Sequence, residues 1–216
     1  MKVPIPVTCS VCGCNFSATG YGERRLSPVF CPTCRVPIVL FDPLSISLIA
    51  ERLLLRSRAE VDGGDPTISI ICSAVAVEAA LTQVLVKWKK IEHNVVKPTA
   101  TQRDKWEKEY KNAARRDKSR RSGFEKSADL VSKYLTNKMF DDFVSGYVKK
   151  SGVIVLEASQ VHKELFDKRN RIMHWGDVDF EKDDALSALK VACDAVSVLK
   201  AMDRERCEAM ERSFRD

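Results

Sequence analysis

The chain has 216 residues, of which 44% are hydrophobic and 31% are charged, and its formal net charge is +6. These values are typical of a globular chain rather than a disordered one, with room for one ordinary domain and a small appendage. No N-terminal hydrophobic signal region precedes the eight cysteines, so we expect a cytoplasmic protein whose thiols stay reduced and whose paired cysteines bind metal.

Residues 1–42 form a predicted separate unit built around two cysteine pairs. An 18-residue spacer separates the two pairs, which are Cys9 with Cys12 and Cys31 with Cys34. Short stretches beside the pairs are typical of strands rather than helices. Two turns that each present two thiolates make a closed tetrahedral site, which predicts a β zinc ribbon with a structural Zn²⁺ ion. Cys14 is an extra thiol that could replace Cys12, although Cys12 completes the two-residue spacing.

Residues 43–216 predict a helical domain, so the fold class is mainly α. Glycine, proline and short polar turns separate the predicted helices. These helices span about 44–61, 67–91, 102–118, 124–135, 139–148, 157–175 and a last segment from about 181. We expect the tail, 204–216, to fray because most of its residues are charged.

The most apolar stretch of the chain is Ile68–Val86, whose length approaches that of a membrane span. It carries several hydroxyl and amide side chains, and Glu78 is its only charge. We therefore predict a central buried helix and no membrane partner. Asp65 followed by Pro66 is a good start for that helix, since proline is favoured at the first helical position.

The basic surplus lies in a helical insertion at about 101–150, which has fourteen Lys and Arg residues against eight Asp and Glu. A charged helix is often only a solvated face. Alternatively, the surplus is the electrostatic footprint of a polyanion such as RNA, with aromatic rings that stack on single-stranded bases. The candidate RNA-binding residues are Lys105, Trp106, Tyr110, Arg115 and Arg116.

The predicted helix at 157–175 carries three polar groups suited to phosphodiester chemistry. At 100° per residue, its apolar face comprises Val161, Leu165, Phe166, Ile172 and Met173. Arg169 falls in the middle of that face and needs an anion or a cleft, because an unpaired buried charge is costly. Glu78 is the expected anion. Asn170 and His174 follow at one edge, one turn apart.

The sequence Arg169-Asn170-x-x-x-His174, followed by Trp175-Gly176 and an amphipathic helix, resembles the HEPN superfamily (higher eukaryotes and prokaryotes nucleotide-binding domains). The small-residue helix Ala74–Leu81 with its embedded acid adds to the resemblance. The resemblance covers about residues 44–200 and leaves the zinc ribbon outside. It implies a HEPN-like bundle that forms a homodimer, bringing two motif helices into one cleft.

The activity that the resemblance implies is metal-independent RNA cleavage. The ribose 2′-OH attacks the adjacent phosphate and leaves a cyclic phosphate end. Many members of the superfamily act as toxins or anti-phage effectors, which implies a possible protein regulator or antitoxin. Other members are non-catalytic modules that bind RNA or nucleotides.

The chemistry of the motif residues suits that reaction independently. His174 could take the 2′-OH proton or protonate the leaving oxygen. Arg169 has a planar fork that matches a phosphoryl group and would stabilise developing charge. Asn170 could orient the imidazole or donate to a phosphate oxygen. Glu78 would position Arg169 while RNA is absent.

Other interpretations stay open. An arginine–glutamate pair between helices can be purely structural, His162 could join the cleft, and Trp175 is expected to pack rather than stack on bases. The whole chain could be a non-catalytic HEPN-type module, or a zinc-ribbon adaptor whose helical part dimerises and docks a protein partner. No catalytic cofactor is expected in any of these cases.

Overall fold

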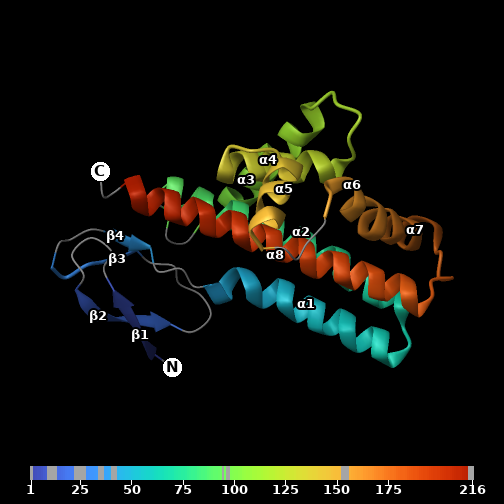
Figure 1. Ribbon diagram of the computed structural model, residues 1–216, viewed down its shortest axis with the longest axis horizontal. Coiled ribbons are helices and arrows are strands. Elements are labelled where there is room, and N and C mark those ends of the chain that lie inside the picture. The colour runs from blue at the N-terminus through green and yellow to red at the C-terminus, as the bar shows by residue number, and fades with distance from the viewer. Residues whose placement is uncertain are drawn as a thin grey trace.

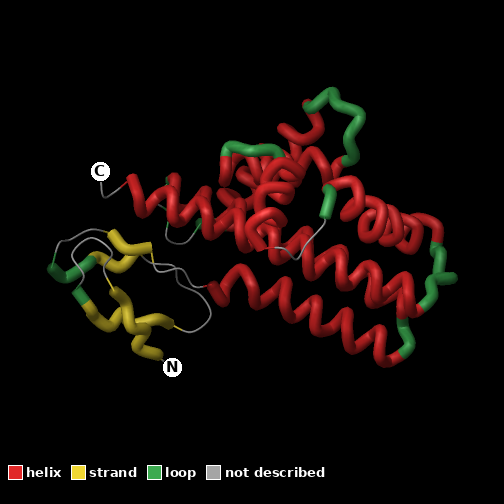
Figure 2. Tube along the Cα trace, viewed as in Figure 1, coloured by secondary structure: helices red, strands yellow, loops and turns green. Residues whose placement is uncertain are grey.

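A computed structural model describes residues 2–8, 14–21, 28–33, 37–39, 43–93, 95, 98–151 and 156–213. The described chain is mainly helical, as the sequence predicts, with four short strands near the N-terminus (Figures 1 and 2). In Figure 1 the strands lie at the end of the molecule where helix α1 begins, and helix α7 lies at the opposite end.

The strands form two separate antiparallel pairs. Strand β1 (Lys2–Thr8) pairs with β2 (Asn15–Tyr21), and β3 (Pro28–Phe30) pairs with β4 (Pro37–Val39). Of the four predicted zinc ligands, the structure describes Cys31, which is buried directly after β3. The other three lie outside the described residues and are Cys9, Cys12 and Cys34.

Three long helices run alongside one another, and α2 (Pro66–Glu92) packs against both α1 (Pro43–Gly63) and α8 (Lys182–Ser213) (Figure 1). The α2 helix begins as predicted, because the Asp65 carboxylate accepts a hydrogen bond from the Ile68 amide at 3.0 Å and Pro66 follows the cap.

Small hydroxyl residues let α1 and α2 approach closely. The Ser57 hydroxyl lies 2.8 Å from those of Ser69 and Ser73, and all three side chains are fully buried. Within the described chain, α2 is the one helix long and apolar enough to cross a membrane, and 56% of its apolar window is buried inside the protein. It therefore packs as the core helix of the bundle, as its polar side chains predict.

Three further helices form a second layer, α3 (Ala100–Arg116), α4 (Gly123–Thr136) and α5 (Phe140–Ser151). Helix α3 contacts α2, α4 contacts both α2 and α8, and α5 packs on α4 and α8. Capping boxes start α3 at Thr99 and α4 at Ser122. The Arg121 guanidinium joins this layer by pairing with Glu125, Asp129 and Asp141.

The predicted helix at 157–175 forms, but with an internal change of winding. Helix α6 (Ala158–Val161) continues into a π-helical segment, η1 (His162–Asp167), and then into α7 (Lys168–Trp175). Gly176 ends α7 with φ of 65°, a left-handed conformation that glycine adopts without steric cost.

The C-terminal tail does not fray as we expected, because α8 continues as a helix to Ser213. Met202 and Cys207 are buried in this part of α8. The Asp203 carboxylate accepts hydrogen bonds from the buried Lys87 ammonium and the Trp88 indole of α2. Packing against α2 therefore stabilises this helical segment, although its many charged residues alone would favour an unfolded, solvent-exposed tail.

Candidate functional site

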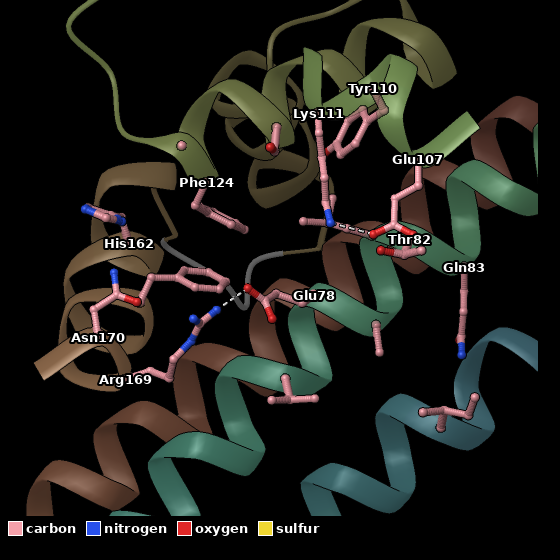
Figure 3. A pocket seen from close by; sticks show the side chains of 17 residues that line it. Glu78, Thr82, Gln83, Glu107, Tyr110, Lys111, Phe124, His162, Arg169 and Asn170 are labelled. Atoms are coloured by element: carbon pink, nitrogen blue, oxygen red, sulfur yellow. Dashed lines mark hydrogen bonds and ion pairs between the residues drawn. The ribbon is translucent and has the colours of Figure 1, made fainter. Parts of the chain in front are cut away.

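A cleft of about 670 Å³ lies over one face of α2, between η1 and α7 on one side and α3 and α4 on the other (Figure 3). Its volume is in the range of small-molecule sites. In Figure 3, Arg169 reaches toward Glu78 from α7, His162 and Asn170 lie at the outer edge of the η1–α7 side, and Tyr110 and Lys111 extend from α3. The other lining residues are Ile49, Val75, Glu78, Ala79, Leu81, Thr82, Gln83, Glu107, Gly123, Phe124, Ser127 and Phe166.

Arg169 forms an ion pair with Glu78, the anion expected for it from the sequence (Figure 3). Although α2 is the central buried helix that we predicted, the Glu78 side chain is 48% exposed, against 25% for Arg169. The guanidinium also lies 5.8 Å from the centre of the Phe166 ring. Its Nε atom is buried and has no hydrogen-bond partner among the described residues, which leaves one donor for a ligand.

Asn170 and His174 share an edge of α7, one turn apart, but only Asn170 lines the cleft. The His174 side chain is exposed near the end of α7. Helix α7 runs antiparallel to α2, because Arg169 meets Glu78 and, further along, the Thr67 hydroxyl donates to the Val178 carbonyl at 3.5 Å. The imidazole therefore lies toward the start of α2, outside the cleft of a single chain.

Apolar side chains surround that end of α7 and are exposed. We call this group the α7 patch, and it comprises Ile68, Val75, Met173, Trp175 and Val178. Two expectations are corrected here, since Met173 is 61% exposed and Trp175 is 80% exposed. Among the described elements, α7 contacts η1 and α2, and these five side chains stay exposed.

The π-helical segment brings a second histidine into the cleft. His162 lies at the start of η1, beside Asn170 in Figure 3, and its Nε2 atom is 3.0 Å from an Asp167 carboxylate oxygen. Its Nδ1 atom is buried without a hydrogen-bond partner among the described residues. Segments of this kind often occur at functional sites, because the extra residue redirects side chains.

The basic insertion contributes differently from our prediction. Trp106 cannot stack on RNA bases, because it is buried and its ring stacks on His93 with centroids 5.6 Å apart. Tyr110 lines the cleft, and burial raises the pKa of its hydroxyl. The other predicted RNA-binding residues are exposed to solvent and are Lys105, Arg115 and Arg116.

The sequence did not identify the aromatic wall of the cleft. The rings of Phe124 and Phe166 stack with centroids 4.7 Å apart and an interplanar angle of 22°. The capping box at Ser122 is a sequence signal for the start of α4, but it does not reveal that the first residues of α4 face η1.

Two cysteines near the N-terminus, Cys14 and Cys31, are in contact within the described residues. The Cys14 and Cys31 sulfur atoms are 3.5 Å apart. Cys14 precedes β2 and Cys31 follows β3, so the contact joins the two strand pairs. Among the residues whose placement the structure describes, no three potential metal ligands come together.

Comparisons with protein-family models, with curated proteins and with solved structures found no match to the chain.

Proposed function

We propose that the chain is a metal-independent endoribonuclease of the HEPN type, in which Arg169, Asn170 and His174 act on one phosphodiester. The observation that supports this most is the geometry of α7. Arg169 lies at the mouth of a cleft with one unpartnered N–H, and Asn170 and His174 follow along an accessible edge. These are the donors and the proton carrier that phosphate-ester cleavage needs.

In the proposed reaction the ribose 2′-oxygen attacks the phosphorus atom and the bond from phosphorus to the 5′-oxygen breaks. The products are a 2′,3′-cyclic phosphate and a 5′-hydroxyl end. His174 accepts the 2′-OH proton or protonates the 5′-oxygen, and Arg169 stabilises the extra negative charge on the phosphoryl oxygens. Glu78 holds the guanidinium in place before RNA arrives.

A second copy of the chain would complete this site at the α7 patch. An indole with 80% of its surface exposed, surrounded by other apolar side chains, favours burial against a partner. Because His174 lies next to the patch, a two-fold contact there would bring two imidazoles together. The proposed homodimer therefore has a single shared RNA cleft.

The N-terminal unit is proposed to be a zinc ribbon that helps to choose the RNA or a protein partner. Two thiolates bound to one tetrahedral zinc ion lie about 3.8 Å apart, given Zn–S bonds of about 2.3 Å. The 3.5 Å between the sulfur atoms of Cys14 and Cys31 fits such a shared ion. Cys31 is accordingly a ligand together with Cys9 and Cys34, and Cys14 competes with Cys12 for the fourth position.

The biological setting extends the same proposal. A cytoplasmic ribonuclease of this type would act as a toxin or an anti-phage effector. A protein regulator or antitoxin that covers the α7 patch would then hold it inactive.

The decisive test is cleavage of a defined single-stranded RNA by purified protein in Mg²⁺-free buffer with a chelator. We expect cleavage to persist and to yield cyclic phosphate ends. His174→Ala should lower the rate by about 10²–10⁴-fold, as for loss of a general acid or base. His93→Ala is the matched control, because His93 lies outside the cleft. Full activity of His174→Ala, or a strict requirement for Mg²⁺, contradicts the proposal.

One observation favours a second candidate function, a non-catalytic RNA- or nucleotide-binding module. Within one chain the cleft contains Arg169 and Asn170, whereas His174 lies outside it. Salt-dependent RNA binding without any cleavage would support this alternative. Absence of RNA binding would favour the zinc-ribbon adaptor instead.

A further inference from the structure

The cleft extends beyond the phosphate-binding groups, and its far end is built by α3. There, Glu107 and Lys111 form an ion pair of 2.6 Å, and the Tyr110 ring lies above Thr82 of α2 (Figure 3). None of these side chains takes part in the proposed cleavage chemistry. The cleft is therefore longer than a single phosphate group requires.

The middle of the cleft is apolar and aromatic. The stacked rings of Phe124 and Phe166 form one wall, while Ala79 and Leu81 of α2 contribute to the floor. Arg169 lies directly beside this wall, with its guanidinium over the Phe166 ring. A ligand that binds Arg169 and extends into the cleft must therefore have a charged group at Arg169 and an apolar, planar group against the aromatic wall.

The charges along the cleft are internally balanced. Arg169 pairs with Glu78 at one end, and Lys111 pairs with Glu107 at the other. The far end thus offers no unpaired cation for a second phosphate. This balance favours a neutral group there, such as a nucleobase.

Polar atoms without protein partners line the same cleft. The Tyr110 hydroxyl and His162 Nδ1 are both buried and have no hydrogen-bond partner among the described residues. Ser127 is close enough to oppose the effect of burial on the pKa of Tyr110, but the two hydroxyls do not meet the geometry of a hydrogen bond. Buried polar groups normally form hydrogen bonds, so these two atoms indicate that a bound ligand presents polar atoms to them.

The spacing along α2 agrees with one nucleotide. Glu78, which marks the position of Arg169, is one turn of helix away from Thr82, a rise of about 6 Å. A ribose spans a similar gap between a phosphate and its base. A phosphate at Arg169 therefore puts the attached base beside the aromatic wall and under Tyr110.

We propose that this cleft binds the ribose and base of the RNA nucleotide whose phosphate contacts Arg169, with the base against Phe124 and Phe166. The inference rests on the proposed function, because it assigns the base-recognition subsite of the same site. The Tyr110 hydroxyl forms a hydrogen bond with the polar edge of the base. Thr82 and Ala79 limit the size of the base that fits. The enzyme accordingly prefers certain bases next to the cleaved bond.

The test is calorimetric binding of the four ribonucleoside 3′,5′-bisphosphates, each of which carries one base with a phosphate on either side. Inorganic phosphate is the reference ligand. We expect at least one bisphosphate to bind about tenfold or more tightly than phosphate, and the four bases to differ in affinity. Ala79→Leu, which fills the floor, should weaken the best ligand by about tenfold or more.

Tyr110→Phe removes one hydroxyl without changing the ring, and should lower the affinity for some bases by about 3–10-fold. Tyr134→Phe is its matched control, because that hydroxyl bonds Glu92 and lies outside the cleft. Each variant is first checked for a wild-type unfolding temperature. Equal affinity for all four bases and for phosphate, or unchanged binding by both cleft variants, overturns the subsite.

Failure of the subsite and failure of the nuclease proposal give different results. If the protein binds one base preferentially but never cleaves RNA, only the proposed cleavage fails. If it cleaves RNA but neither cleft variant alters bisphosphate binding or the base next to the cut, only the subsite fails. His174→Ala should retain bisphosphate binding, since His174 lies outside the cleft.

Discussion

Helix α2 carries two ion pairs with distant parts of the chain, and the two differ in their exposure to water. At one end, Lys87 is 4% exposed and Asp203 is 15% exposed, and the ammonium lies 2.6 and 2.8 Å from the two carboxylate oxygens. The Trp88 indole donates to the same carboxylate at 2.7 Å. Near the middle of α2, the pair of Glu78 and Arg169 lies open to the cleft.

The difference separates a structural pair from one that can exchange partners. Burial lowers the pKa of Lys87 and the nearby Asp203 carboxylate opposes that effect, so the ammonium depends on its partner. Arg169 keeps contact with solvent and has a donor to spare, so a phosphate can compete with Glu78. One helix thus has a C-terminal end that stabilises the fold and a middle part suited to binding.

The largest expected effect is on the structural pair. Asp203→Ala leaves the Lys87 ammonium buried without its carboxylate, and should lower the free energy of unfolding by about 3–5 kcal/mol. Urea denaturation measures this loss. Glu78→Ala is the comparison variant and should cost less than about 1 kcal/mol, as for other exposed pairs. Similar losses in both variants would remove the distinction between the two ion pairs.

A medium effect is expected on catalysis. Glu78→Gln keeps the size of the side chain but removes its charge, so Arg169 should lose its fixed position and RNA cleavage should fall by about tenfold. The unfolding temperature should stay close to that of the wild type.

The control for that variant is Glu51→Gln, which breaks another exposed pair between helices, with Lys200, away from the cleft. It should leave cleavage unchanged. Wild-type cleavage by Glu78→Gln would exclude Glu78 from the mechanism and make its pairing with Arg169 purely structural.

The smallest expected effect concerns the end of α7. Gly176 has φ of 65°, so Gly176→Ala should destabilise the protein by about 1 kcal/mol through steric strain alone. Gly146→Ala in α5 is the control, since nothing lies near its Cβ position, and it should be neutral or stabilise by up to about 1 kcal/mol. If both substitutions change the free energy of unfolding equally, the left-handed conformation of Gly176 does not contribute to the stability of α7.

Features encoded by neighbouring residues could be predicted from the sequence. Asp65 with Pro66 starts α2, and Gly176 ends α7, because caps and turns depend on local chemistry. The partner of Arg169 was also predictable, since Glu78 is the only charge in the apolar stretch of α2. Such a charge has few possible partners.

Features that depend on which element covers another could not be predicted. The periodicity of the motif helix assigns Met173 to an apolar face, but only the fold shows that its side chain is mostly exposed. Trp106 sits among basic residues, yet it is buried against His93. The cleft depends in the same way on Phe124 and Phe166, whose contact joins segments about forty residues apart in the sequence.

The winding of η1 sets the direction in which the motif points. A π-helical turn holds one residue more than an α-helical turn, so every side chain after Asp167 is rotated by about 100° from the position that a continuous α-helix would give it. Deleting a single codon within this segment would reset that rotation. Arg169 would then swing off the α2 face and lose Glu78, although each motif residue would remain in the protein.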